Sequence, residues 1–282
     1  MSFRVFTKQE WALCFVTMLW GASFLIIRLA MQACGPMYFV GLRFGCASLV
    51  LLLVSRSLLR EMTLREVVAG CTLGVIVFLG FGLQTMGLVT IPAAKSAFIT
   101  AFYVPLVPLL ELVFLRHKLS PYVWAGLTLA FPGVLLISWP ENAAFGLGAG
   151  EIATVICALV FAVEIVLLSV LAPGCDTRRM VTVEVLVTSL LGFACMPLLG
   201  EQCVRLPVWV MASVVGLGLA TACIQSILTW AQKSVPPSRA TLIYTGEPVW
   251  AGIFGALCGE QLGVPALTGC VLIIAGILVS NR

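Results

Sequence analysis

Charged residues are scarce in this sequence. Asp, Glu, Lys and Arg make up 10% of its 282 residues, whereas a soluble domain carries about 25%. So few charges cannot cover a surface that faces water, which excludes a soluble enzyme and turns most of the surface toward lipid. Because each membrane span takes about 20 residues, the chain holds about ten spans and has no room for a sizeable soluble domain.

Residues that serve metal, cofactor or covalent chemistry are few as well. The one histidine, His117, lies between Arg116 and Lys118, where a cation would be repelled, so we expect no metal and no cofactor. The eleven cysteines form no Cys-x-x-Cys pair, and most lie in apolar runs as small hydrophobes. Cys34 and Cys203 fall in connections on one predicted face, and whether they pair is left open. The net charge of +4 gives no reason to expect nucleic acid as a partner.

The apolar runs predict an all-α integral membrane protein that crosses the bilayer many times. The first run is too long for the core of a signal peptide, so we expect it to be a retained helix. When successive connections between spans are assigned alternately to the two sides of the membrane, twelve of the sixteen Lys and Arg residues fall on the side that holds the N-terminus. This bias predicts that both termini are cytoplasmic and that the membrane is the cell inner membrane. The expected spans are 11–31, 36–55, 67–89, 93–114, 121–139, 151–171, 180–199, 208–232, 239–258 and 264–281.

The sequence repeats itself at about half its length. Pro105 and Pro248 are 143 positions apart, and the same spacing relates Gly126 to Gly269 and Gly133 to Gly276. A period near half the length indicates a duplicated unit. We therefore predict two five-helix repeats, residues 1–140 and 146–282. Since five is odd, the second repeat enters the membrane inverted, as in secondary transporters that bind substrate between their halves.

Several short motifs in this order resemble those of a known family. They are Leu19-Trp20-Gly21-Ala22-Ser23-Phe24, Leu42-Arg43-Phe44, the stretch 127–138, Glu247-Pro248-Val249-Trp250-Ala251, Gly259-Glu260-Gln261-Leu262, Gly269 and Ala275-Gly276. Across nearly its whole length the chain resembles the ten-helix, two-repeat transporters of the drug/metabolite transporter superfamily, in particular the EamA family. The resemblance implies transport of a small organic metabolite, often outward, by alternating access, and it does not fix the substrate.

Polar side chains inside two spans follow helical spacing. Ser96, Thr100, Tyr103 and Glu111 share one face of the fourth span. Thr221, Gln225, Thr229 and Gln232 share one face of the eighth span. Such stripes predict the lining of a cavity, although Ser, Thr and Gln also form hydrogen bonds that hold helices together.

Three carboxylates are predicted deep in the membrane, where a charge costs about 2.5–3.5 kcal/mol. Glu164 lies near the middle of the sixth span and Glu184 in the cytoplasmic half of the seventh. Glu247 lies near the middle of the ninth span, one turn after Tyr244 and next to Pro248, which loosens the helix. These acids are candidates for exchanging a proton or for capturing a cationic group of a substrate. The alternative is a structural ion pair or a neutral, hydrogen-bonded acid.

Two further side chains are candidates for the site. Arg43 lies about seven residues into the second span, where its guanidinium is able to bind a substrate carboxylate with two hydrogen bonds. An internal salt bridge or an extension toward the headgroups is the competing interpretation. Trp20 lies within the first span and is a candidate for stacking on a substrate, or for packing alone.

The leading hypothesis is a secondary transporter of a small polar metabolite. The acids, Arg43 and the aromatics suit an amino acid or a related zwitterionic or cationic solute, such as an adenosyl amino-acid conjugate. The other expected partners are the lipid bilayer and a proton or an antiported solute. A second hypothesis is an intramembrane scaffold or binding protein that moves no solute. A third, an intramembrane enzyme, needs paired catalytic residues at matched depth, and the sequence offers only carboxylates on separate helices.

Overall fold

The computed structural model describes residues 6–138, 148–257 and 263–281, and in these ranges the chain is helical with no strand. Three short turns, η1 (Leu58–Glu61), η2 (Glu111–Leu115) and η3 (Pro197–Leu199), join longer helices. The longer helices are α1 (Lys8–Ala30), α2 (Pro36–Val54), α3 (Leu64–Thr90), α4 (Ala93–Thr100), α5 (Tyr103–Leu110), α6 (Pro121–Ile137), α7 (Ala149–Leu171), α8 (Thr177–Cys195), α9 (Val208–Ala231), α10 (Pro237–Tyr244), α11 (Glu247–Leu257) and α12 (Val264–Val279).

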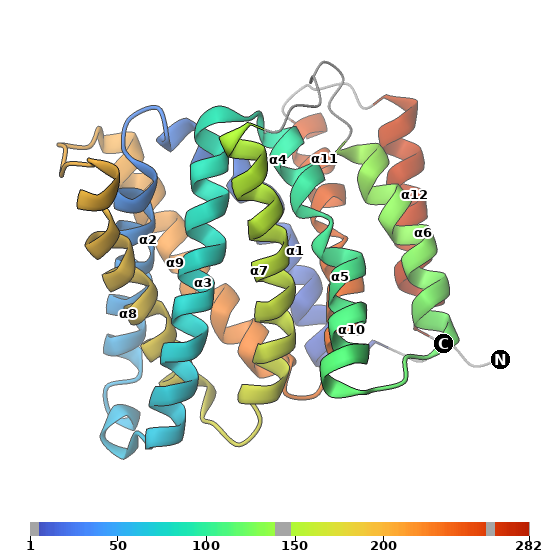
Figure 1. Ribbon diagram of the computed structural model, residues 1–282, viewed down its shortest axis with the longest axis horizontal. Coiled ribbons are helices and arrows are strands. Elements are labelled where there is room, and N and C mark those ends of the chain that lie inside the picture. Colours follow the sequence, from blue (N-terminus) through green and yellow to red (C-terminus); the bar gives the residue numbers. More distant parts are fainter. Residues whose placement is uncertain (1–5, 139–147, 258–262, 282) are drawn as a thin grey trace.

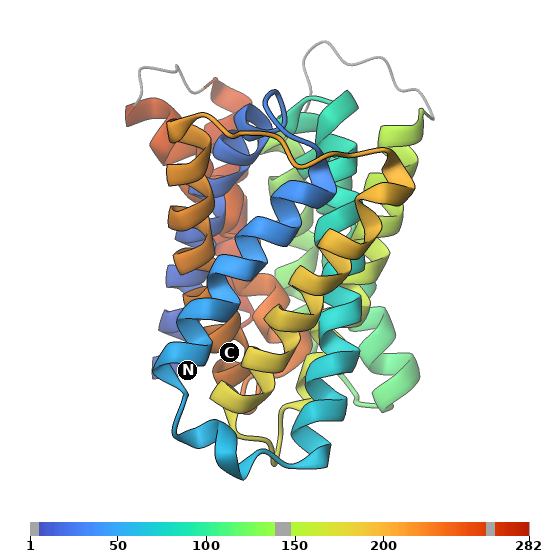
Figure 2. The same cartoon turned by 90° about the vertical axis from the view of Figure 1, so that its left-hand side faces the viewer.

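These helices make ten spans in two inverted sets of five. Helix α1 rises from the lower end of the bundle, whereas α7 begins at the upper end, and both α1 and α12 have their terminal ends at the bottom (Figure 1). The halves are interleaved, because α3 packs on α7 and α8 while α9 packs on α1 and α2. Two like-with-like pairs, α2 with α8 and α6 with α12, complete the arrangement. Figure 2 looks onto the side formed by α2 and α8. The predicted repeat boundaries, 1–140 and 146–282, stay a prediction.

Two of the ten spans are broken helices. The predicted span 93–114 is divided between α4 and α5, and the span 239–258 between α10 and α11. A proline ring collides with the carbonyl four residues earlier, so Pro105 disturbs the helix at Ala101 and Pro248 disturbs it at Tyr244. The interruptions lie at residues 101–102 and 245–246, next to these positions. The loosening that Pro248 predicted is therefore a full break, and it occurs in both halves.

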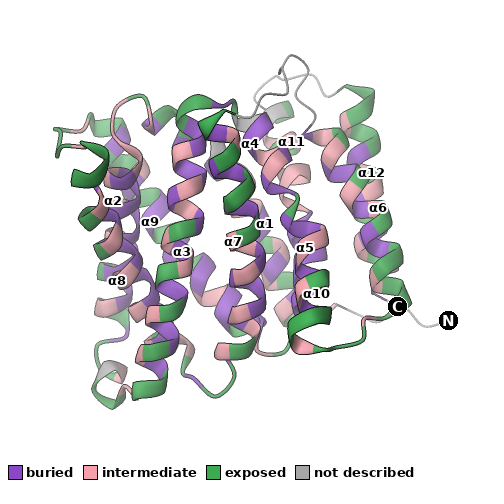
Figure 3. Ribbon diagram, in the orientation of Figure 1, coloured by how far each residue is buried: buried purple, intermediate pink, exposed green. Residues whose placement is uncertain are grey.

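Exposed apolar side chains cover the outside of the bundle. Leu53, Val208 and Val271 are between 66% and 87% exposed, and the buried residues face inward (Figure 3). Within the described ranges, seven segments are long and apolar enough to cross a membrane, and α6 and α12 are shorter apolar helices. The broken pair α10 and α11 forms the tenth span. The chain is thus a multi-pass membrane protein.

Glycines allow two helices of the bundle to approach closely. Along α2, the Gly41-x-x-x-Gly45 spacing lies against α8, where the Ser189 hydroxyl donates to the Gly41 carbonyl at 2.8 Å. The similar spacing from Gly255 ends at Gly259, which lies outside the described residues together with the rest of the motif 259–262. Cys34 and Cys203 are both free thiols, so the pairing left open is not formed here.

Candidate functional site

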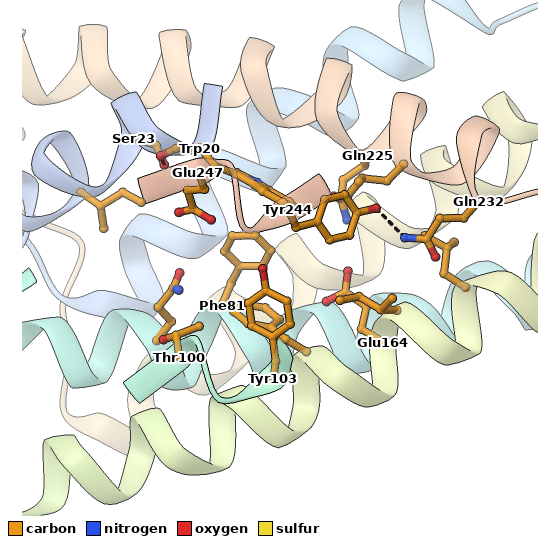
Figure 4. Close-up of a pocket in the computed structure, with 16 residues that line it drawn as sticks. Trp20, Ser23, Phe81, Thr100, Tyr103, Glu164, Gln225, Gln232, Tyr244 and Glu247 are labelled. Atoms are coloured by element: carbon orange, nitrogen blue, oxygen red, sulfur yellow. Dashed lines mark hydrogen bonds between the residues drawn. The ribbon is translucent and has the colours of Figure 1, made fainter. Parts of the chain in front are cut away.

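A pocket with about 710 Å³ of space, open solvent included, lies between the two halves. Helices α1, α3, α7 and α9 and both broken spans contribute its walls, and Figure 4 shows the side chains converging from these elements. Helices α2, α6, α8 and α12 contribute no described lining residue. The lining consists of Trp20, Ser23, Ile27, Phe81, Gln84, Thr100, Tyr103, Phe161, Glu164, Ile165, Leu168, Gln225, Leu228, Gln232, Tyr244 and Glu247.

The breaks in the two divided spans bring four residues to this pocket. Thr100 ends α4 and Tyr103 begins α5, while Tyr244 ends α10 and Glu247 begins α11. All four line the pocket, so each broken span contributes the residue on either side of its break. A break inside a span is tolerated only where the freed backbone faces protein or a cavity rather than lipid. This location is therefore the one where binding is expected.

The pocket-lining residues on α1 and α7 are related by the internal repeat. Trp20, Ser23 and Ile27 on α1 lie 141 positions before three lining residues of α7, which are Phe161, Glu164 and Leu168. The aromatic and aliphatic positions are matched, but a serine in the first half stands where the second half has a glutamate. The other pocket acid, Glu247, also comes from the second half, so the acidic side of the pocket belongs to that half.

The charge of the lining has one sign. Glu164 and Glu247 both face the pocket, and none of the described lining residues is Lys, Arg or His. Aromatic rings surround these acids. Trp20 meets Tyr244 edge to face with ring centroids 5.2 Å apart, and Phe81 meets Phe161 at 5.4 Å. Carboxylates together with aromatic faces form a surface that attracts cations.

A third acid lies outside the pocket and is hydrogen-bonded to one of its lining residues. Glu184 on α8 does not line the pocket, and its Oε1 accepts a 2.6 Å hydrogen bond from Nε2 of Gln225, which does line it. Among the described residues, none donates to the second oxygen of Glu184, although the side chain is buried. Gln225 therefore connects the pocket wall with a buried carboxyl group outside it.

Some polar atoms at the pocket have unused hydrogen-bonding capacity. Nε2 of Gln232 donates to the Tyr244 hydroxyl at 2.7 Å. No described residue bonds to Oε1 of Gln232 or to the hydroxyl of Thr100, both of which are buried. Since buried polar atoms are normally satisfied, a bound solute or water is the expected partner of these two.

Most of the predicted site residues converge in the structure. Four of the predicted residues lie elsewhere: Ser96 and Thr229 are buried outside the lining, Glu184 reaches it through Gln225, and Arg43 does not reach it. Their functional roles stay predictions. The predicted residues that line the pocket together are Trp20, Thr100, Tyr103, Glu164, Gln225, Tyr244 and Glu247.

Arg43 is engaged in packing between helices. Its Nε donates to the Thr221 hydroxyl at 2.7 Å, and its guanidinium lies 5.1 Å from the ring centroid of Phe81 and 5.7 Å from that of Phe44. None of its described contacts is an ion pair with a carboxylate. The guanidinium is thus stabilised by a hydroxyl and two aromatic faces.

Glu111 occupies a different place from the one its sequence position suggested. The polar stripe of the fourth span predicted that it lines a cavity, but it is 2% exposed and lies outside the pocket lining. It accepts hydrogen bonds from the backbone N–H of Ser238, at 2.9 Å, and from the Ser238 hydroxyl. A carboxylate at the first turn of α10 satisfies N–H groups that have no partner within the helix.

Eight lining residues were not site candidates in the sequence analysis. Four of them are aliphatic, Ile27, Ile165, Leu168 and Leu228, and the other four are polar or aromatic. Ser23 and Phe161 were detectable, because the spacing of 141 relates them to Glu164 and Trp20. Gln84 is an isolated polar residue in an apolar span, which is itself a signal. Nothing in the sequence distinguishes Phe81 from the other aromatic residues of α3.

Ten spans in two inverted halves, with a polar pocket at paired helix breaks, define a membrane protein of the transporter class. The model of the EamA-like transporter family matches residues 8–139 and again 148–282, so the chain belongs to that family. The two matches correspond to the two halves of the bundle.

Known proteins agree with this assignment. An uncharacterized transporter of Archaeoglobus fulgidus is 24% identical over 268 residues, covering 95% of this chain and 83% of the relative. The uncharacterized transporter YvbV of Bacillus subtilis is 27% identical over 136 residues, covering 47% of this chain and 44% of the relative. A solved structure described only as the crystal structure of a protein has the same fold, with a TM-score of 0.78, 19% identity and 95% of each chain covered.

Proposed function

We propose that the protein is a secondary transporter that carries a small organic solute through the central pocket by alternating access. One observation carries the proposal: the pocket lies between inverted halves and is lined by the residues on both sides of both helix breaks. Half-helices that end at a site are able to change their angle without breaking the packing of whole spans. This arrangement supports transport over a scaffold, which needs no pocket, and over an intramembrane enzyme.

The substrate we infer is an organic amine with an apolar or aromatic body. Glu164 and Glu247 supply negative charge, and Trp20 and Phe161 supply apolar faces. A cationic amine satisfies both features. A zwitterion such as an amino acid needs a partner for its carboxylate as well, and the predicted partner, Arg43, does not itself line the pocket and lies behind the ring of Phe81. A purely anionic solute is disfavoured.

The acids also provide a means of coupling. A carboxylate buried without a cation is costly, so each acid needs a positive charge to balance it when the amine leaves. Release of a bound cation on one side is then compensated by uptake of a proton or of a second cation there. We propose exchange of the amine against a proton or another solute.

The orientation follows from the distribution of basic residues. The end of the bundle at which α1 begins and α12 ends also holds Arg65, Arg179 and Lys233. By the positive-inside rule this end faces the cytoplasm of a cell whose inner membrane holds the protein, with both termini inside.

Flux into proteoliposomes tests the proposal. Phenylethylamine, phenylalanine, phenylethanol and phenylpropionate share an aromatic body and differ in charge, so they isolate the contribution of the amine. We expect saturable uptake of the amine, and faster uptake when the proton gradient points out of the liposome. Uptake of the amino acid should be weaker, and uptake of the acid should not exceed that of protein-free liposomes. Absence of saturable flux or exchange for every amine and amino acid in a broader panel contradicts transport of this class.

A further inference from the structure

An ion pair joins the two halves at the upper end of the bundle. Nζ of Lys95 on α4 lies 2.5 Å from Oε1 of Glu151 on α7. The two side chains are 8% and 15% exposed, so water reaches them little in this conformation. Helix α4 belongs to the first half and α7 to the second, and both begin at the upper end of the bundle (Figure 1), so the pair joins the two halves at that end.

A second ion pair joins the halves at the lower end. Nε of Arg239 on α10 lies 2.9 Å from Oε1 of Glu10 on α1, and the side chains are 9% and 3% exposed. The guanidinium of Arg239 also donates to the Ile277 carbonyl and to Oδ1 of Asn281, both at 2.9 Å. It donates to the Ser280 hydroxyl as well. This pair therefore ties α1 and α10 to the end of α12.

The two pairs occupy equivalent positions in the two halves. Glu10 and Glu151 are each the third residue of α1 and α7, the helices that begin the two halves. Lys95 and Arg239 are each the third residue of α4 and α10, the first parts of the broken spans. The same contact is thus made twice, once at each end, with the acid and the base exchanged between the halves.

The location of the cations argues against a purely local role. A positive side chain in the first turn of a helix is opposed by the helix dipole. Both broken spans nevertheless begin with one, and in each case an acid of the other half compensates it. The two cations therefore stabilise contact between the halves rather than the helices that carry them. Glu10 has a local role as well, because its Oε2 accepts from the Thr7 backbone N–H at 2.8 Å and caps α1.

We propose that Lys95–Glu151 and Glu10–Arg239 are the gates at the two ends of the transport pathway, each broken when the pocket opens on its side. The proposal rests on the transport function proposed above. A pair buried in low dielectric attracts strongly, and once the mouth opens, water hydrates both separated charges and limits the cost of separation. Helices α4 and α10 connect each gate with a break that lines the pocket.

Side-specific labelling of a pocket cysteine tests the gates without knowledge of the substrate. A reporter at Ser23→Cys, in a background whose eleven cysteines are replaced, is exposed to a membrane-impermeant cationic thiol reagent in right-side-out and inside-out vesicles. We expect Lys95→Gln to raise the labelling rate at least threefold from the side on which α4 begins, and Glu10→Gln to do so from the opposite side. The charge exchange Lys95→Glu with Glu151→Lys should close the upper gate again and lower the labelling rate toward its original value.

Equal effects from both sides, or no change for either variant, overturn the proposal. If Glu10→Gln fails to fold, as judged by its melting transition, Arg239→Lys keeps the charge but loses the fork of donors and should give a smaller increase from the same side. Labelling requires no solute, so a protein that moves no tested amine but shows these opposite responses contradicts only the proposed substrate. Normal amine flux without side-specific labelling contradicts only the gates.

Discussion

Gly133 on α6 packs so closely on Gly269 of α12 that a β-carbon added to Gly133 would lie 2.8 Å from the Gly269 carbonyl oxygen. The reciprocal β-carbon on Gly269 would lie 2.6 Å from the Gly133 carbonyl oxygen. Gly126 and Gly276 meet in the same manner, at 2.7 and 2.6 Å. By the repeat, Gly133 is equivalent to Gly276 and Gly126 to Gly269, so the repeat converts one contact into the other. Two inverted halves related by a two-fold axis require this symmetry.

Substitution of Gly133 by Ala is expected to destabilise this seam. The new methyl group must displace backbone, which costs about 1–3 kcal/mol in a well-packed interior. Gly216→Ala on α9 is the matched control, because a β-carbon there meets nothing within 4 Å and gains up to about 1 kcal/mol of helix propensity. Melting temperatures in detergent check the pair. Equal transitions for the two variants would show that the seam is not tightly packed in solution.

Removal of either pocket acid should weaken amine transport. Glu164→Gln and Glu247→Gln keep the shape of the side chain and remove the charge, so we expect at least a tenfold loss of kcat/KM for a cationic substrate, or about 1.4 kcal/mol. The control is Glu61→Gln, whose carboxylate is 75% exposed outside the pocket. Neutral-solute leakage should not change. Wild-type amine flux in both pocket variants contradicts the binding role of these acids.

Gln225 is expected to stabilise the folded protein through its hydrogen bond to Glu184. Gln225→Leu removes the described partner of Glu184 Oε1 and leaves a buried acid unsatisfied, at a cost of about 1–3 kcal/mol. Adding Glu184→Leu removes the orphaned group, so the double variant should be more stable than the two single effects predict when added. Thermal unfolding of the four proteins measures this coupling. Strict additivity is the result at odds with a direct contact.

The number of spans, their apolar character and the disturbance at Pro248 followed from the sequence because each depends on local properties. Runs of about 20 apolar residues form helices in lipid whatever surrounds them, and the effect of Pro105 and Pro248 on a helix is local as well. The direction in which a side chain points around its helix depends on neighbours. Arg43 lies as deep in the membrane as a binding residue should, but its side chain points toward Thr221 and Phe81. This direction depends on how α2 packs on α9, which the sequence does not reveal.

Arg43 should therefore contribute to folding rather than to substrate choice. Arg43→Met keeps an unbranched apolar stem, removes the hydrogen bond to Thr221 and is expected to lower the melting temperature. The KM for an amine should stay within about twofold of the original, since the guanidinium does not line the pocket. A selective loss of transport for amino acids, with amine transport retained, would instead support the carboxylate clamp.

The two cysteines at the upper end should react very differently with alkylating reagents. Burial, and to a lesser degree the charge of Glu201, raise the pKa of the Cys34 thiol to about 11, whereas Cys203 is exposed. Since the thiolate is the reactive form, labelling of Cys34 at pH 8 should be slow and should accelerate about tenfold per pH unit up to its pKa. Mass spectrometry after timed alkylation from pH 7 to 10 separates the two sites. Rapid, pH-insensitive labelling of Cys34 is the outcome that this environment forbids.

A structure of the protein with a transported amine bound is the most direct test of the binding site. The account predicts the nitrogen within hydrogen-bond distance of Glu164 or Glu247 and the apolar body against Trp20 or Phe161. A transported solute bound at another place, with its charged group in contact with neither acid, contradicts the account.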